Sequence, residues 1–127
     1  LKEDDFSYTL DTKTDDRGSF TEVLKTKGLG QVSINISKPG ITKGNHWHHS
    51  KNEKFLVVKG EGIIKFRNVD EDKIIEYKVS DKKLEVVDIP CGYTHNIINV
   101  GTEDMVTLMW ANETFDPNNP DTFFLEV

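Results

Sequence analysis

The stretch GITKGNHWHHSKNEKFLVVKG, residues 40–60, decides how the fold of this chain is interpreted. It holds three of the four histidines of the sequence within four positions. His46 and His48 are two residues apart, so on a β-strand both imidazoles would lie on one face, about 7 Å apart along the strand. Two imidazoles placed in this way can chelate one cation. We therefore predict a metal site here, with His49 pointing to the other side of the strand.

Two further side chains can complete this site. Glu53 follows His48 by five residues, and the intervening Ser50-Lys51-Asn52 is typical of a turn, so Glu53 can return on the next strand as an oxygen ligand. His95 follows a second turn, Pro90-Cys91-Gly92, and can supply a fourth ligand from a distant strand. The alternative is a solvated histidine patch. That alternative leaves both the clustering and the two separate motifs unexplained, so the pattern favours a metal.

The rest of the chain predicts an all-β fold with little or no helix. No convincing amphipathic helical pattern is present, and short runs rich in β-branched and aromatic residues recur between turn signals instead. These runs are residues 20–25, 30–37, 54–59, 62–68, 73–79, 84–89, 96–100 and 105–111. Eight or more short strands in about 110 residues predict a sandwich or a small barrel. Residues 115–127 are expected to form a loop and then a short extended or helical piece that packs on the barrel.

Composition narrows the possible partners and location. The 127 residues suit one domain, and the formal net charge of -6 argues against a nucleic-acid partner, although local lysines can still attract a small anion. The lone Cys91 excludes an intrachain disulfide and suits a reducing cytoplasm. No apolar run approaches the roughly 18 residues of a membrane span, and no signal peptide is visible. We therefore predict a cytoplasmic protein without a membrane partner. Its start at Leu1 is what an excised fragment would show.

Two spaced motifs resemble those of the cupin superfamily. The first is G-(x)5-HWH-(x)4-E-(x)6-G over residues 40–60, and the second is PCG-(x)2-H-(x)3-N over residues 90–99. A glycine usual in the second motif is replaced by Leu84, at a turn rather than at a ligand. The resemblance implies a cupin jelly-roll β-barrel that binds one metal through His46, His48, Glu53 and His95.

Upstream segments resemble a more specific group of enzymes. The segments DRGSFTE at 16–22, QVS at 31–33 and GITKGNH at 40–46 are similar to nucleotide-sugar epimerases of the dTDP-4-dehydrorhamnose 3,5-epimerase type. This resemblance implies that Arg17 and Lys43 contact the nucleotide diphosphate of a substrate.

The proton-transfer groups of that family do not carry over directly. Its base aligns with His46, which as a metal ligand would be a poor base, and its catalytic tyrosine would lie near residues 109–115, where this sequence has none. We take Lys54 and Tyr93 as the candidate catalytic residues. The alternatives are that Lys54 is a solvated strand residue and that Tyr93 is an aromatic packed at the rim of the barrel.

Over nearly its whole length the chain resembles the C-terminal cupin domain of bifunctional capsular polysaccharide enzymes that synthesise UDP-N-acetyl-L-fucosamine. The resemblance implies that residues 1–127 are one cupin domain from the C-terminal part of a larger homodimeric enzyme. It also implies that the domain epimerises C3 of a UDP-4-keto-6-deoxy-N-acetylhexosamine, while a separate reductase domain uses NADPH. We expect Zn²⁺ because the reaction needs no redox chemistry, but imidazole and carboxylate ligands also accept iron, manganese or nickel.

The proposed chemistry follows from the 4-keto group of such a sugar. That group acidifies the neighbouring C3 proton because the resulting anion is an enolate, and a divalent metal can stabilise its oxygen as a Lewis acid. Two other classes fit the same residues. One is a small metal dioxygenase or isomerase, and the other is a non-catalytic sugar-nucleotide or metal-binding module that positions a partner domain or forms a dimer.

Overall fold

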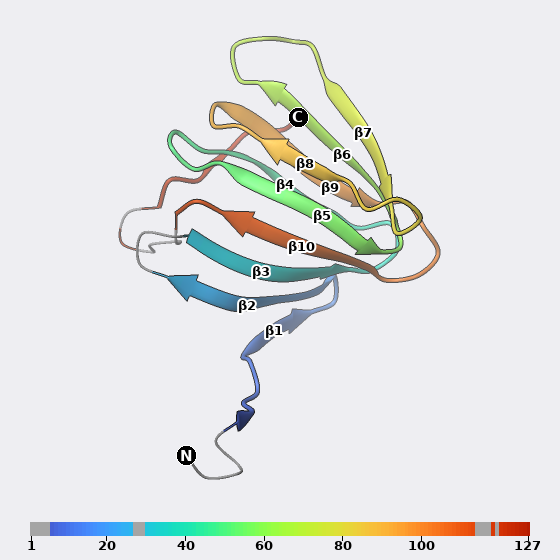
Figure 1. The fold of residues 1–127 in the computed structure, drawn as a ribbon. Coiled ribbons are helices and arrows are strands. Elements are labelled where there is room, and N and C mark those ends of the chain that lie inside the picture. The colour runs from blue at the N-terminus through green and yellow to red at the C-terminus, as the bar shows by residue number, and fades with distance from the viewer. Residues whose placement is uncertain (1–5, 27–29, 114–117, 119) are drawn as a thin grey trace.

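The computed structural model describes residues 6–26, 30–113, 118 and 120–127. Two antiparallel sheets face each other (Figure 1). Sheet A contains, in spatial order, β1 (Thr12–Asp15), β2 (Gly18–Thr26), β3 (Gly30–Ser37), β10 (Met105–Ala111), β5 (Glu53–Lys59) and β8 (Val86–Ile89). Sheet B contains β11 (Phe123–Phe124), β4 (Thr42–Trp47), β9 (Tyr93–Asn99), β6 (Glu61–Asn68) and β7 (Ile75–Ser80).

The space between the sheets has an apolar half. Its buried side chains come from β5 to β10, and they are Phe55, Val57, Ile64, Phe66, Val79, Val87, Ile89, Ile97 and Met105. Full burial of one such side chain stabilises a fold by about 1.5–3 kcal/mol. This half of the interior therefore supplies most of the hydrophobic stabilisation, and it leaves the region beside β3 and β4 for polar groups.

The polar half of the interior lies against β3. Alternate residues of a strand point to opposite faces, and here the inward residues are Gln31, Ser33, Asn35 and Ser37, all buried. Gln31 Nε2 donates to Ser33 Oγ at 3.1 Å, and Asn35 Nδ2 donates to Ser37 Oγ at 3.1 Å. Such bonds offset the cost of burying polar groups. We call Gln31, Ser33 and Asn35 the polar wall.

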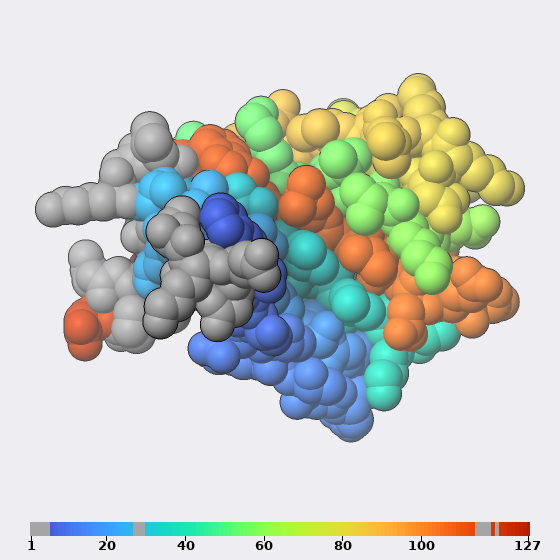
Figure 2. Space-filling view, turned by 60° about the horizontal axis from the view of Figure 1, so that its bottom comes forward, coloured from blue at the N-terminus to red at the C-terminus, as the bar shows by residue number. Residues whose placement is uncertain are grey.

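The outer face of sheet A carries aliphatic side chains. In Figure 2 the strands β3, β10 and β5 run side by side on the face in view, in teal, orange and green. The outward aliphatic residues of β3, β10, β5 and β8 are Val32, Ile34 and Ile36 of β3, Val106 and Leu108 of β10, Leu56 and Val58 of β5, and Val86 of β8. We call these residues the outer apolar face. A sheet exposed to water on one side usually alternates apolar and polar residues. The outer apolar face instead has aliphatic residues at outward positions that are usually polar.

The end of the chain covers part of the outer side of sheet B. The N–H of Leu125 donates to the carbonyl of Asn45 at 2.9 Å, and the Thr94 hydroxyl donates to the carbonyl of Leu125. Arg67 donates to the carbonyl of Glu126 at 2.7 Å. The predicted extended piece near the C-terminus is therefore present over residues 120–127, while residues 114–117 and 119 lie outside the described part.

The all-β jelly-roll prediction is confirmed, with no α-helix in the described residues. The two sheets do not pair with each other there, so they form a sandwich rather than a closed barrel. All eight predicted strands are present, and the largest shift is in β9, which begins at Tyr93. The eight predicted runs omitted β1 and β11, which are short edge strands, and β4, which was considered only as a possible strand for the histidines. None of the described residues belongs to a helix of the length and apolarity that a membrane crossing requires.

Candidate metal centre

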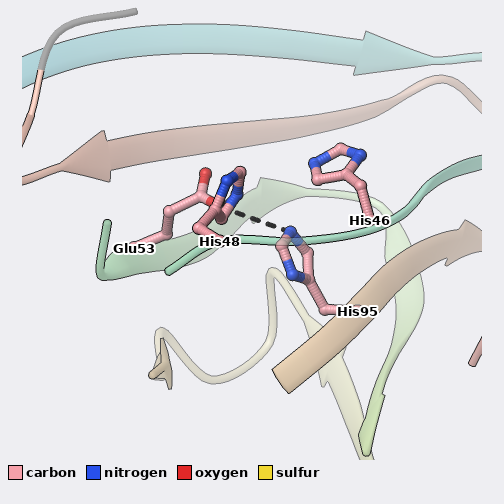
Figure 3. A group of neighbouring side chains, drawn as sticks. All are labelled: His46, His48, Glu53 and His95. Atoms are coloured by element: carbon pink, nitrogen blue, oxygen red, sulfur yellow. Dashed lines mark hydrogen bonds and ion pairs between the residues drawn. The ribbon is translucent and has the colours of Figure 1, made fainter. Parts of the chain in front are cut away.

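Four side chains converge between the two sheets. They are His46 in β4, His48 just beyond its end, Glu53 at the start of β5 and His95 in β9 (Figure 3). One ligand atom from each lies within 4.8 Å of the others. The ring centroid of His46 lies 5.3 Å from that of His48 and 4.8 Å from that of His95. The structure therefore brings together all four predicted metal ligands, drawn from both sheets.

The hydrogen bonds of His48 determine which of its nitrogens faces the cluster. Nδ1 lies 2.5 Å from the carbonyl oxygen of Asp121. A carbonyl only accepts, so Nδ1 carries the proton of this bond. Nε2 lies 2.7 Å from Oε1 of Glu53. Nε2 is therefore the atom that a cation at the centre of the cluster would bind, and the Nδ1 contact orients the ring for it.

His95 supports the fit of the cluster to a metal. The residue is 1% exposed, and its Nε2 lies 3.3 Å from Oε1 of Glu53. That contact does not meet hydrogen-bond geometry, and Nε2 has no hydrogen-bond partner among the described residues. Buried polar atoms in native proteins nearly always have a partner. A cation between His95, His48 and Glu53 would give this atom its missing interaction.

The pKa values of two of the four groups are shifted toward the protonation states that bind metals. Burial, together with the neighbouring His95 and His48, lowers the pKa of His46 to about 4, while Glu53 acts to raise it. Burial by itself raises the pKa of Glu53, but the hydrogen bond from His48 and the close imidazole of His95 outweigh burial and hold that pKa well below its usual range. An unprotonated imidazole and an ionised carboxylate are the forms that bind divalent metals.

A β-bulge lets β4 present both Lys43 and His46 to the interior. In a regular strand residues three apart face opposite sides. The pairing of β4 with β9 shifts register between Gly44 and His46, and Asn45 adopts a φ of 60°. A bulge adds one residue to a strand and so re-aims the side chains beyond it. At Gly44, where φ is 112°, an added Cβ would lie 2.8 Å from the carbonyl oxygen of His95, so glycine is required there.

The cluster opens into a cavity of about 410 Å³. That volume lies in the range typical of small-molecule sites. Besides the four cluster residues, the cavity is lined by the polar wall and by three lysines, Lys13, Lys43 and Lys51. Glu22 and Glu113 also border it. The cavity therefore combines neutral hydrogen-bonding groups with both cationic and anionic groups, and its lysines can attract a ligand that carries negative charge at short range.

The two predicted substrate-binding residues have different positions. Lys43 lines the cavity, and its Nζ donates to Asn35 Oδ1 at 2.9 Å and to the carbonyl of Ile36 at 3.0 Å. Burial lowers the pKa of the Lys43 amine, and Arg17 lowers it further while Asp15 raises it. The guanidinium of Arg17 donates to the carbonyl of Thr42, beside Lys43 but not among the lining residues.

Neither predicted catalytic residue lines the cavity of the three histidines. Lys54 alternates with Glu53 along β5, and it pairs with the exposed Asp88 on the outer side of the sheet. Tyr93 packs its ring edge-on against Phe66, with centroids 5.8 Å apart. Both residues border a second cavity of about 470 Å³ rather than the one lined by the histidines, although Glu53 borders both. An acid–base role for Lys54 or Tyr93 therefore stays a prediction from the sequence, and neither residue borders the cavity that the histidines line.

Sequence reasoning missed several residues of the cavity. Lys51, treated only as part of a turn, is 8% exposed and lines the cavity beside His48 and Glu53. The polar wall was also missed, although the polar residues at every second position of β3 were a visible signal. His49 lies outside the cluster, as predicted from its position, with its ring 4.7 Å from that of Trp47.

Comparisons with known proteins agree with this architecture. The family described as Polysaccharide biosynthesis C-terminal domain matches residues 13–123. A UDP-2-acetamido-2,6-beta-L-arabino-hexul-4-ose reductase from Pseudomonas aeruginosa is 50% identical over 127 residues. The match covers 100% of this chain but 34% of that relative, so the chain spans about a third of its length.

Solved structures show the same fold. The capsular polysaccharide assembling protein CapF from Staphylococcus aureus is 72% identical, with a TM-score of 0.96 over 100% of this chain and 34% of that one. A recombinant oxalate oxidase in complex with glycolate is 25% identical, with a TM-score of 0.69 over 88% of this chain and 57% of that one. The predicted resemblance to cupins and to the capsular polysaccharide enzymes is thereby confirmed.

The lowered pKa of His46 predicts a pH-dependent stability in the metal-free domain. Between its ordinary pKa of 6.5 and about 4, the unfolded chain binds a proton at His46 that the folded domain does not. The free energy of unfolding therefore falls as the pH drops through this window, by up to about 1.4 kcal/mol per pH unit. Urea denaturation with excess chelator at pH 7, 6, 5 and 4 measures this, with His46→Gln as the control. Parallel pH profiles for the wild type and His46→Gln would contradict the prediction.

Proposed function

We propose a function from the premise that this chain belongs to the polysaccharide biosynthesis C-terminal domain family. In this proposal the chain is a metal-dependent epimerase domain that inverts C3 of a UDP-4-keto-6-deoxy-N-acetylhexosamine, in the synthesis of a capsular polysaccharide precursor. The observation that carries this proposal is the convergence of His46, His48, Glu53 and His95 within 4.8 Å at a cavity large enough for a sugar. The names of the similar proteins support the substrate class.

The metal is proposed to be zinc, held by the three imidazoles and the carboxylate. Mixed nitrogen and oxygen ligands of this kind suit zinc, and the reaction requires no change of oxidation state. When bound, the ion supplies a Lewis acid for the oxygen of the 4-keto group, which acidifies the proton at C3. The protein residues around it bind the sugar, orient it and limit access of water to the reacting carbon.

The lining of the cavity supports a UDP-sugar as the ligand. The polar wall offers amide and hydroxyl groups, which match the hydroxyl and acetamido groups of a hexosamine. Lys43 and Lys13 bring positive charge to a chain of net charge -6, and a diphosphate would be attracted to them at short range. Arg17 is proposed as a further diphosphate contact from the edge of the cavity, since it is held beside Lys43 at the carbonyl of Thr42.

We also propose that the domain works as the C-terminal part of a longer bifunctional enzyme. The chain spans 34% of a relative that is named as a reductase. A reductase activity and its NADPH would then belong to the remaining part of such a protein. A cytoplasmic location stays a prediction from the sequence.

A homodimer is proposed from the outer apolar face. Leu108 and Val86 at this face are 37% and 52% exposed. Contiguous apolar patches of this kind mark interaction surfaces in soluble proteins. A second copy of the chain is the proposed partner, because oligomers of identical subunits most often pair through one self-complementary patch.

The epimerase proposal predicts exchange of the C3 proton with solvent. The zinc-loaded domain should replace the C3 hydrogen of the 4-keto substrate by deuterium in heavy water, as followed by NMR. His48→Ala should lose metal and slow the exchange at least about 100-fold, because it removes a ligand. His49→Ala is the matched control and should exchange normally, since His49 lies outside the cluster.

Three outcomes would contradict this proposal. Absence of exchange with the zinc-loaded wild type would reject the epimerase. Oxygen uptake by iron-loaded protein, measured with an oxygen electrode, would favour a dioxygenase. If the His48→Ala variant of the intact enzyme binds no metal but keeps full activity, a binding module would be favoured.

The dimer proposal predicts that one charge on the outer apolar face separates the subunits. Wild-type protein should sediment as a dimer at micromolar concentration, and Leu108→Asp should sediment as a monomer because a carboxylate would be buried without a partner. Val100→Asp, in the loop after β9, is the control and should remain dimeric. A monomeric wild type, or a dimeric Leu108→Asp variant, would refute this interface.

A further inference from the structure

One carboxylate near the end of the chain gathers the backbone of residues 49–51. Asp121 Oδ1 accepts from the N–H of His49 at 2.9 Å. Asp121 Oδ2 accepts from the N–H of Ser50 at 2.8 Å and from the N–H of Lys51 at 3.3 Å. The hydroxyl of Ser50 donates to the same Oδ2 at 3.1 Å. Two oxygens thus accept from three consecutive backbone amides and one hydroxyl.

The backbone of the same residue contacts a cluster side chain. The carbonyl oxygen of Asp121 accepts from His48 Nδ1 at 2.5 Å, while Nε2 of that ring faces Glu53. Asp121 therefore holds residues 48 to 51 from both its main chain and its side chain. We call this set of contacts the Asp121 clamp.

The clamped segment connects two of the four cluster residues. Residues 48–52 lie between β4 and β5 outside any strand, so no sheet ladder holds their backbone. His48 stands at the start of this segment, and Glu53 follows directly after it. Lys51 lies within it and extends into the cavity as a buried side chain. A loop in this position would sample several conformations unless its amides were bound.

The clamp itself is held by structure on its C-terminal side. β11 follows Asp121 and pairs with β4, with Phe123 opposite Trp47 and Phe124 opposite His46. The rings of Trp47 and Phe123 pack at 4.9 Å between centroids. Asp121 is thus anchored to the strand that carries His46, and it reaches from there to the segment that carries His48.

The bonds that Asp121 accepts stabilise the ionised form of its carboxylate. Its partial burial acts to raise its pKa, but the donors at Ser50, His49 and Lys51 lower that pKa to about 2. The carboxylate is therefore ionised at neutral pH, and charge-assisted bonds of this kind are stronger than neutral ones.

We propose that Asp121 is a positioning residue of the candidate metal centre. Its clamp fixes the ring of His48 toward Glu53 and sets Lys51 in the cavity, so that the C-terminal segment is an integral part of the site. This inference rests on the proposed metal binding by the cluster and is independent of the reaction that the metal supports. Outer contacts that orient metal ligands commonly change metal affinity 10- to 100-fold.

Asp121→Asn and Asp121→Ala test the clamp in the full chain. The zinc dissociation constant is measured by competition with a chromophoric chelator, and the cobalt-loaded proteins are compared by visible absorption. We expect zinc binding about 10- to 100-fold weaker in Asp121→Ala, and an altered cobalt spectrum. The substitution keeps the carbonyl that contacts His48, but it removes the carboxylate that holds the amides of residues 49–51 directly after this ligand. Asp121→Asn keeps the shape and one acceptor oxygen, so it should fall between Asp121→Ala and the wild type.

Glu126→Gln is the matched control, because it also neutralises a carboxylate of the C-terminal segment. The described contact of Glu126 is made by its backbone carbonyl, which the substitution leaves in place. It should bind zinc as the wild type does. Circular dichroism and the thermal midpoint of the metal-free proteins show whether each variant is folded. If Asp121→Ala is unfolded, the zinc affinity of Asp121→Asn tests the clamp. A folded Asp121 variant with wild-type zinc affinity and an unchanged cobalt spectrum would overturn the clamp. A wild type that binds no zinc would instead overturn the proposed metal function.

Discussion

A buried carboxylate constrains the polar half of this protein. Glu53 lies between two imidazoles, with Oε1 at 2.7 Å from His48 Nε2 and 3.3 Å from His95 Nε2. Burying a charge is unfavourable unless a partner compensates for it. The histidines supply that compensation without an ion, and a divalent cation would supply it more completely. The positions of β4, β5 and β9 must therefore be compatible with this one group.

The interior is compatible with this constraint because its apolar core and its polar site lie in different halves. The apolar half stabilises the sandwich through side chains such as Phe55, Ile64 and Met105. The polar half keeps a hydrogen-bonded wall along β3 and an open cavity beside the histidines. The separation lets one small domain be both stable and hollow at its candidate site.

Each member of the cluster depends on a different local device. His46 reaches the interior through the bulge at Gly44 and Asn45, whose positive φ values few other residues accept. Glu53 begins β5, where strand alternation turns it inward. His48 stands outside the strands, and its ring is oriented by the carbonyl of Asp121, 73 positions further along the chain. The site is therefore assembled from both sheets and from the end of the chain.

The sequence by itself predicted the four residues of the cluster and the fold class. His46, His48 and Glu53 are close in the chain, so spacing and turn chemistry were enough to bring them together, and His95 followed from the second motif. Alternating patterns likewise predicted the strands. Only the tertiary structure decided which face of each strand points inward, because a pattern of period two fits either face. β3 turns Ser33 inward and Ile34 outward, and β5 turns Lys54 away from the cluster. The roles of Lys51 and Asp121 were also invisible, since contacts between residues far apart in the chain leave no trace in local spacing.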